Sequence, residues 1–166
     1  GANTAGENNP TSPEESVVVK GKAAKLQSTW IGFIGIGAFA SASMFTGNFV
    51  DIDGTNGILS FGQPFTAKPT KLTGYYKYTP VNIDYMEQWD SKVDPDLKSG
   101  DSDQCIIYIA LCTKNYEIRT NPKSRQLFDP NDASVIAYGE LVAKEAVSGE
   151  EANGYKKFSI DIKYRK

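Results

Sequence analysis

The strongest constraint on the fold is a stretch of strict alternation in residues 71–79, with the sequence KLTGYYKYT. Successive side chains of a strand point to opposite faces. The stretch therefore has an inward set, Leu72, Gly74, Tyr76 and Tyr78, and an outward set, Lys71, Thr73, Tyr75, Lys77 and Thr79. Prolines at positions 64, 69 and 80 limit its pairing, because proline cannot donate a ladder hydrogen bond. The sequence predicts a short strand with one face in the core and one in water.

Other segments predict a fold built only from strands. Alternation recurs in residues 155–166, with Phe158, Ile160, Ile162 and Tyr164 inward. Residues 104–113 are apolar on both sides, which is typical of a central strand covered on both faces. Shorter strands are predicted within residues 16–27, 58–61, 115–120 and 134–142. With no long amphipathic helix, this pattern predicts an all-β, antiparallel two-sheet β-sandwich of jelly-roll topology.

Two segments fall outside the regular strand pattern. Residues 1–15 are polar and rich in Asn, Thr, Ser, Pro and Gly, which predicts a flexible linker or frayed terminus before a single domain at 16–166. Residues 26–50 carry no charge, which raises the question of a membrane span. Polar residues and glycines interrupt this run, so a buried segment of a globular core is favoured over a span. Its aromatic residues are then expected in the core: Trp30, Phe33, Phe39, Phe45 and Phe49.

The ionisable residues argue against several classes of function. The chain has 18 basic and 20 acidic residues and a net charge of -2, without the positive field that nucleic acid binding requires. It has no histidine, the commonest general base and metal ligand at neutral pH. Cys105 and Cys112 are about 23 Å apart along one strand and on opposite faces, too far for a disulfide. We therefore expect no nucleic acid partner, no His-dependent catalysis and no site built from both thiols.

An acidic loop at residues 84–103 carries candidate binding residues. Seven acidic residues there are opposed by two lysines, and Tyr85 and Trp89 lie among them. Aromatic rings stack on the apolar face of a pyranose, and carboxylates such as Glu87 accept hydrogen bonds from its hydroxyls. The same oxygens suit calcium, which is left open, while no cofactor is predicted. The alternative is a solvated loop whose Tyr85 and Trp89 pack back onto the sandwich.

Several runs, in this order along the chain, resemble a known family. ASASMFTGNF, FGQPFTAKPTKLTGYYKYTP, SDQCIIYIALC, VIAYGEL and FSIDIKYR are similar to the "putative carbohydrate metabolism domain" family of secreted and surface proteins in gut-dwelling Gram-negative bacteria. The resemblance covers about residues 16–166. It implies a jelly roll similar to carbohydrate-binding modules, placed after another domain in a lipoprotein-like protein at the outer-membrane surface, in the extracellular space or in the periplasm. The polar start without Met is consistent with an additional N-terminal domain. The resemblance supplies no catalytic residues.

Three functions remain open, and the favoured one is a carbohydrate-binding module that takes part in glycan recognition or utilisation. The glycan would lie across the outward strand face or against the loop, contacting Lys71, Tyr75 and Lys77 or Tyr85, Glu87 and Trp89. The second function is a glycoside hydrolase-like enzyme with two carboxylates about 5 to 5.5 Å or about 6.5 to 9.5 Å apart. Glu87 with Asp84 or Asp90 could supply them, but acids in so polar a loop lack the burial that a general acid needs. The third is a structural or assembly module of a surface lipoprotein that binds no sugar.

Overall fold

The structure, a computed structural model, describes residues 9–33, 36–54, 56–85 and 98–165. The described residues form twelve strands. The helical elements of the described residues are two short 3-10 turns, η1 (Pro122–Ser124) and η2 (Ala152–Gly154). All pairs between the described strands are antiparallel. The prediction of an antiparallel, sandwich-like, all-β fold is therefore confirmed.

The described strands form five small sheets, whereas the prediction had two sheets. The sheets are β1 (Thr11–Glu14) with β2 (Ala23–Leu26); β3 (Thr29–Phe33) with β4 (Ile36–Ala40); β5 (Gly47–Asp53), β6 (Asn56–Phe61) and β9 (Tyr116–Arg119); β7 (Lys71–Tyr76) with β11 (Lys156–Asp161); and β8 (Cys105–Cys112), β10 (Val135–Ala143) and β12 (Lys163–Tyr164). The C-terminal stretch explains part of this division, because it pairs first with β7 and then with β10.

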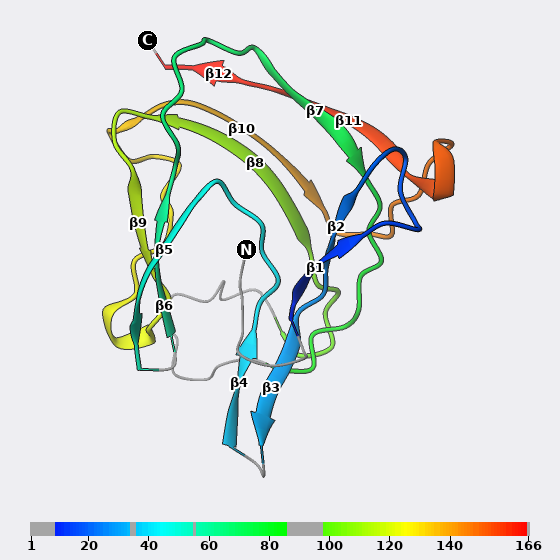
Figure 1. The fold of residues 1–166 in the computed structure, drawn as a ribbon, viewed down its shortest axis with the longest axis horizontal. Coiled ribbons are helices and arrows are strands. Elements are labelled where there is room, and N and C mark those ends of the chain that lie inside the picture. The colour runs from blue at the N-terminus through cyan, green and yellow to red at the C-terminus, as the bar shows by residue number, and fades with distance from the viewer. Residues whose placement is uncertain (1–8, 34–35, 55, 86–97, 166) are drawn as a thin grey trace.

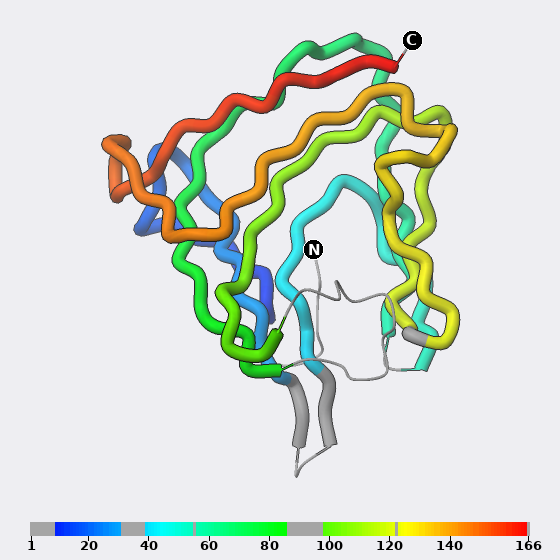
Figure 2. Tube along the Cα trace, turned by 180° about the vertical axis from the view of Figure 1, so that it is seen from behind, coloured from blue at the N-terminus to red at the C-terminus, as the bar shows by residue number. Residues whose placement is uncertain are grey.

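The sheets are arranged around an arch that β8 and β10 form. In Figure 1, β8 and β10 arch side by side, β5, β6 and β9 stand at one end of the arch, and β1 and β2 lie toward the other end. The β3–β4 hairpin projects at the bottom, away from β12 at the top. Figure 2 shows the same arch from behind, with the C-terminal stretch following the outer side of β10.

Among the described residues the core is small, and most of it belongs to β10 and the C-terminal stretch. Its buried apolar residues are Ile58, Ile118, Val135, Ala137, Ala143, Ile160 and Ile162. The alternation predicted for residues 71–79 is confirmed, since the outward set is exposed and the inward set is half-buried. In the C-terminal stretch Ile160 and Ile162 are buried as expected, but Tyr164 is exposed. Its hydroxyl donates to the Pro69 carbonyl oxygen at 2.9 Å, which holds the ring at the surface.

Residues 104–113 were expected to form a central strand, and this was wrong. Within the described residues β8 pairs only with β10 and lies at the edge of its sheet. Ile106 and Tyr108 are consequently exposed. Cys105 and Cys112 are free thiols, and both are half-buried.

The uncharged segment 26–50 also differs from expectation, because most of its aromatic residues are not in the core. Trp30, Phe39 and Phe49 are exposed. Phe45 is half-buried and stacks on Phe61, with ring centroids 4.4 Å apart. The side chain of Phe33 lies outside the described part. The reason is that the segment forms the projecting β3–β4 hairpin and the strand β5, which lies at the edge of its sheet among the described strands. Among the described residues, no helix is long and apolar enough to cross a membrane.

The N-terminal segment is more ordered than a linker. Thr11–Glu14 forms β1, so the expectation for residues 1–15 was wrong at these positions, while residues 1–8 lie outside the described part. Pro10 is fully buried, and its carbonyl oxygen accepts from the Gln27 amide at 2.8 Å. The Thr11 hydroxyl donates to the Ser43 carbonyl oxygen at 2.9 Å. These bonds fix a polar stretch whose composition alone suggested disorder.

Glu14 caps the turn that follows β1, which gives a prediction for pH dependence. Its Oε1 accepts from the Ser16 hydroxyl at 2.7 Å and from the backbone amides of Ser16 and Val17 at 2.8 and 3.0 Å. These bonds, the hydroxyl first, lower the pKa of Glu14 from 4.5 to about 2. Because the folded-state pKa is depressed, the stabilisation is complete above pH 4.5 and is lost as the pH falls toward 2.

We therefore expect Glu14→Gln to lower the free energy of unfolding at pH 7 and to flatten its decline between pH 4.5 and 2. Urea unfolding at several pH values measures both effects. Glu15→Gln is the control, because Glu15 is exposed and pairs only with the exposed Lys22 at the surface. Identical pH profiles for the two variants would contradict the capping role.

Candidate functional site

The outward side of the paired strands β7 and β11 places three residues of the predicted outward set, Lys71, Thr73 and Tyr75, beside three residues of β11. We call it the outer polar face and define it as Lys71, Thr73, Tyr75, Lys157, Ser159 and Asp161. The register pairs Tyr75 with Lys157, Thr73 with Ser159 and Lys71 with Asp161. Directly opposed residues of an antiparallel pair share a face. The row therefore offers an aromatic ring, two hydroxyls and an ion pair in succession.

The predicted residues of this row differ in their surroundings. Tyr75 is 44% exposed, which leaves part of its ring accessible. The Lys71 Nζ lies 3.3 Å from Asp161 Oδ1, and both side chains are largely in solvent, so the pair contributes little to stability. Lys77 lies beyond the end of β7, where its Nζ donates to the Asn153 carbonyl oxygen at 3.3 Å and sits 5.7 Å from the centre of the Tyr155 ring. Lys77 is therefore engaged by the η2 turn.

A groove of about 340 Å³ continues from the outer polar face. Its lining residues are Tyr138, Gly139, Glu140, Ser159, Ile160, Asp161 and Lys163. Ser159 and Asp161 belong to both surfaces, which makes the groove and the face one continuous polar region. The Tyr138 hydroxyl donates to Glu140 Oε2 at 2.8 Å. Burial, and then the hydrogen bond to the Glu140 carboxylate, raise the pKa of Tyr138, so the phenol keeps its proton at neutral pH.

The contributions of β10 and β11 to this region were missed in the sequence. The outward positions of Lys157, Ser159 and Asp161 were visible from the alternation of residues 155–166. Nothing in the sequence indicated that this strand pairs with β7, whose paired residues lie 80 to 90 positions earlier along the chain. Tyr138 and Glu140 gave no signal, because residues 134–142 were predicted only as a short strand, without an assignment of its faces.

The remaining predicted residues lie elsewhere or outside the described part. Tyr85 packs against the β3–β4 hairpin, with ring centroids 5.2 Å from Trp30 and 5.9 Å from Phe39. Glu87 and Trp89 fall in residues 86–97, outside the described residues. The structure thus separates Tyr85 from the outer polar face, and the role of Glu87 and Trp89 stays a prediction.

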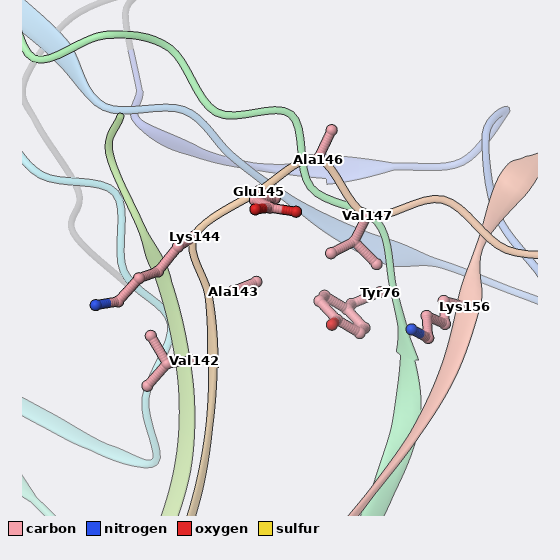
Figure 3. A pocket seen from close by; sticks show the side chains of 8 residues that line it. All are labelled: Tyr76, Val142, Ala143, Lys144, Glu145, Ala146, Val147 and Lys156. Carbon is pink, nitrogen blue, oxygen red and sulfur yellow. The ribbon is translucent and has the colours of Figure 1, made fainter. Parts of the chain in front are cut away.

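A second hollow, of about 410 Å³, lies on the inner side of β7 (Figure 3). Tyr76 and Val147 lie side by side in it, with Lys156 next to Tyr76, while Lys144 extends away from them. Burial, and then the nearby Cys105, raise the pKa of Tyr76. The Tyr76 ring packs edge-on against Phe158 at 5.7 Å and is half-buried. This hollow therefore offers a sugar less ring surface than the outer polar face does.

The chemistry of the groove suits hydrogen bonding better than acid catalysis. Glu140 and Asp161 both line it, but both are exposed. A general acid of a glycosidase needs a buried or otherwise perturbed carboxyl group. Within the part of the chain that the structure describes, no three His, Cys, Asp or Glu side chains gather as a metal site. Exposed carboxylates beside hydroxyls can instead accept hydrogen bonds from a polyhydroxylated ligand.

The fold and this region define a sandwich-like, all-β domain with a polar, ligand-sized surface. The whole chain, residues 1–166, matches the profile of the family described as putative carbohydrate metabolism domain. The chain belongs to this family, and the match includes the first 15 residues. The family description associates the domain with carbohydrate metabolism. No curated protein and no solved structure matches the chain.

Proposed function

We propose that this domain is a carbohydrate-binding module that binds a glycan across the outer polar face and the groove beside it. The observation that carries the proposal is the β7–β11 register, which sets the accessible Tyr75 ring in line with two hydroxyls and the Lys71–Asp161 pair. Membership of a family linked to carbohydrate metabolism supports a sugar as the ligand. In this proposal the domain acts at the outer-membrane surface or outside the cell, following a further N-terminal domain.

Each part of the region has a role in binding. The Tyr75 ring stacks on the apolar face of a pyranose, and hydroxyl groups of Thr73 and Ser159 exchange hydrogen bonds with the sugar. Asp161 and Glu140 accept from sugar hydroxyls, while Lys71 donates. Lys71 and Tyr75 are about 13 Å apart along the strand, so the face is long enough for an oligosaccharide. The groove volume of about 340 Å³ lies at the low end for ligand sites, which suits a single sugar unit of that chain.

Substitution of Tyr75 by alanine tests this proposal. A panel of soluble glycans identifies a ligand, and calorimetry then compares the variants. We expect Tyr75→Ala to weaken binding roughly tenfold, about 1.4 kcal/mol, because the stacking surface is lost. Phe65→Ala is the matched control, since Phe65 is an exposed aromatic residue outside the outer polar face, and it should leave the affinity unchanged.

Two results would overturn the proposal. If Tyr75→Ala and Phe65→Ala bind as the unmodified protein does, the outer polar face is not the binding surface. If no glycan of a broad panel binds while a partner protein does, the domain is a structural or assembly module.

A further inference from the structure

Three aromatic side chains form an exposed cluster at the β3–β4 hairpin, and two of them, Trp30 and Phe39, were expected in the core. Trp30, Phe39 and Tyr85 are 47%, 43% and 42% exposed, and we call them the aromatic trio. Single exposed apolar residues are ordinary on protein surfaces, whereas a contiguous group indicates an interaction site. The outer polar face does not account for the trio, because none of its residues belongs to β7 or β11.

The trio is assembled by backbone pairing and is therefore preformed. Trp30 and Phe39 are direct partners in the β3–β4 register, so their side chains share a face. Tyr85 joins them from a distant part of the chain. It lies two residues after Ile83, whose amide donates to the Asp101 carbonyl oxygen and whose carbonyl oxygen accepts from the Gly100 amide, both at 2.8 Å. Preformed aromatic groups bind a ligand with little loss of side-chain entropy.

The angles between the rings restrict what the trio can bind. Trp30 and Tyr85 meet edge to face with 69° between their planes, and Phe39 is tilted by 31° from Tyr85. Rings at such angles cannot all lie flat on one planar surface. They can contact the different sides of one chain of sugar units, where each pyranose presents its own apolar face.

A polar side chain two residues before Trp30 offers a hydrogen-bond donor that would orient such a ligand. Ser28 precedes Trp30 by two residues, and its hydroxyl oxygen accepts from the Ala42 amide at 3.0 Å. The hydroxyl proton of Ser28 remains able to donate, because that bond uses only the oxygen as acceptor. An apolar surface with a small number of placed polar groups is the usual composition of a small-ligand site.

We infer that the aromatic trio is a second glycan-binding site, which takes a single soluble polysaccharide chain and not the flat surface of a crystalline polysaccharide. This inference rests on the proposed function. The trio lies at the hairpin end of the molecule, and the groove is lined by Lys163 of β12 at the opposite end (Figure 1). One domain would therefore hold two glycan segments at once.

The experiment measures the binding stoichiometry of soluble cello-, xylo-, manno- and galacto-oligosaccharides by calorimetry. We expect two sites on the unmodified protein, with Trp30→Ala removing one and Tyr75→Ala weakening the other. Trp30→Phe should keep the trio site with an affinity reduced less than tenfold, because a ring is retained. Phe49→Ala is the matched control, since Phe49 is 61% exposed in the same uncharged segment and lies outside the trio. Circular dichroism confirms that each variant is folded.

The outcomes separate the two proposals. Loss of all binding in Tyr75→Ala, with Trp30→Ala unaffected, overturns the trio site and leaves the proposed function standing. Loss of all binding in Trp30→Ala, with Tyr75→Ala unaffected, overturns the outer polar face and supports the trio. Equal losses of glycan binding in Trp30→Ala and Phe49→Ala overturn the trio site. The trio site is also overturned if Trp30→Ala changes the sedimentation of the protein without changing its glycan stoichiometry, because the trio then mediates self-association. If microcrystalline cellulose retains the unmodified protein but not Trp30→Ala, the trio binds a flat crystalline surface, which contradicts the single-chain ligand.

Discussion

Gly139→Ala should lower the free energy of unfolding by about 2 to 3 kcal/mol, because the added methyl group overpacks the contact between β10 and β11. A Cβ at this position would lie 2.5 Å from the Asp161 carbonyl oxygen and 2.8 Å from Cγ2 of Ile160. A side chain could move away from such a contact, but the oxygen belongs to the backbone of β11. The strands must therefore separate, and urea unfolding measures the cost.

Gly57→Ala is the matched control for this prediction. Gly57 also lies in a strand, but its added Cβ would meet only the side chains of Leu59 and Phe49, both at the ordinary distance of 3.7 Å. We expect a change within about 0.5 kcal/mol, or a small gain, because alanine restricts the unfolded chain more than glycine does. Equal losses at both positions would mean that the close approach of β11 to β10 is not a constraint on the fold.

The same substitution links stability to the proposed function. Gly139 lines the groove, and the strand that it would displace carries Ser159 and Asp161. Movement of β11 would shift both residues relative to Glu140. A glycan bound across the outer polar face should therefore be bound more weakly by Gly139→Ala, even at a temperature where the variant is fully folded.

The local pattern of the chain predicted the strands from β6 onward and the two faces of β7, but it did not predict β1, β3, β4 or β5. Residues 71–79 alternate with a period of two, and the structure gives the same inward and outward sets. Periodicity reports on a single strand because it depends only on the direction of successive side chains. It could not reveal which strands pair, since β7 and β11 meet through a choice among many distant partners. The groove depends on that choice, so its residues were not found.

The sequence also misplaced several apolar residues, for a different reason. The absence of charge in residues 26–50 suggested burial, yet Trp30, Phe39 and Phe49 are exposed. Apolar character favours the interior, but much of the surface of any folded protein is apolar as well. β8 shows the same effect, because its residues are apolar and yet it lies at the edge of its sheet. Exposure is decided by which layers cover a segment, and that information is not local.

Ile160→Ala should be the most destabilising single truncation that the C-terminal stretch allows. Ile160 is 4% exposed, and it reaches Gly139 of β10 from its place opposite Leu72 of β7. Removing its buried carbon atoms costs their transfer free energy and leaves a cavity, which together amount to about 2 to 5 kcal/mol. Because the core of the described residues is small, the neighbouring strands have few other apolar contacts to compensate.

Ile136→Ala provides the comparison, since it removes the same atoms from a strand of the same region. Ile136 is 44% exposed, so its truncation should cost less than about 1 kcal/mol. Urea unfolding of the two variants gives the difference directly, and unchanged m-values would show that both still unfold from a similarly compact state. If the two truncations cost the same, the C-terminal stretch does not form the core, and the β7–β11 register that places Tyr75 beside Ser159 and Asp161 would lose its support.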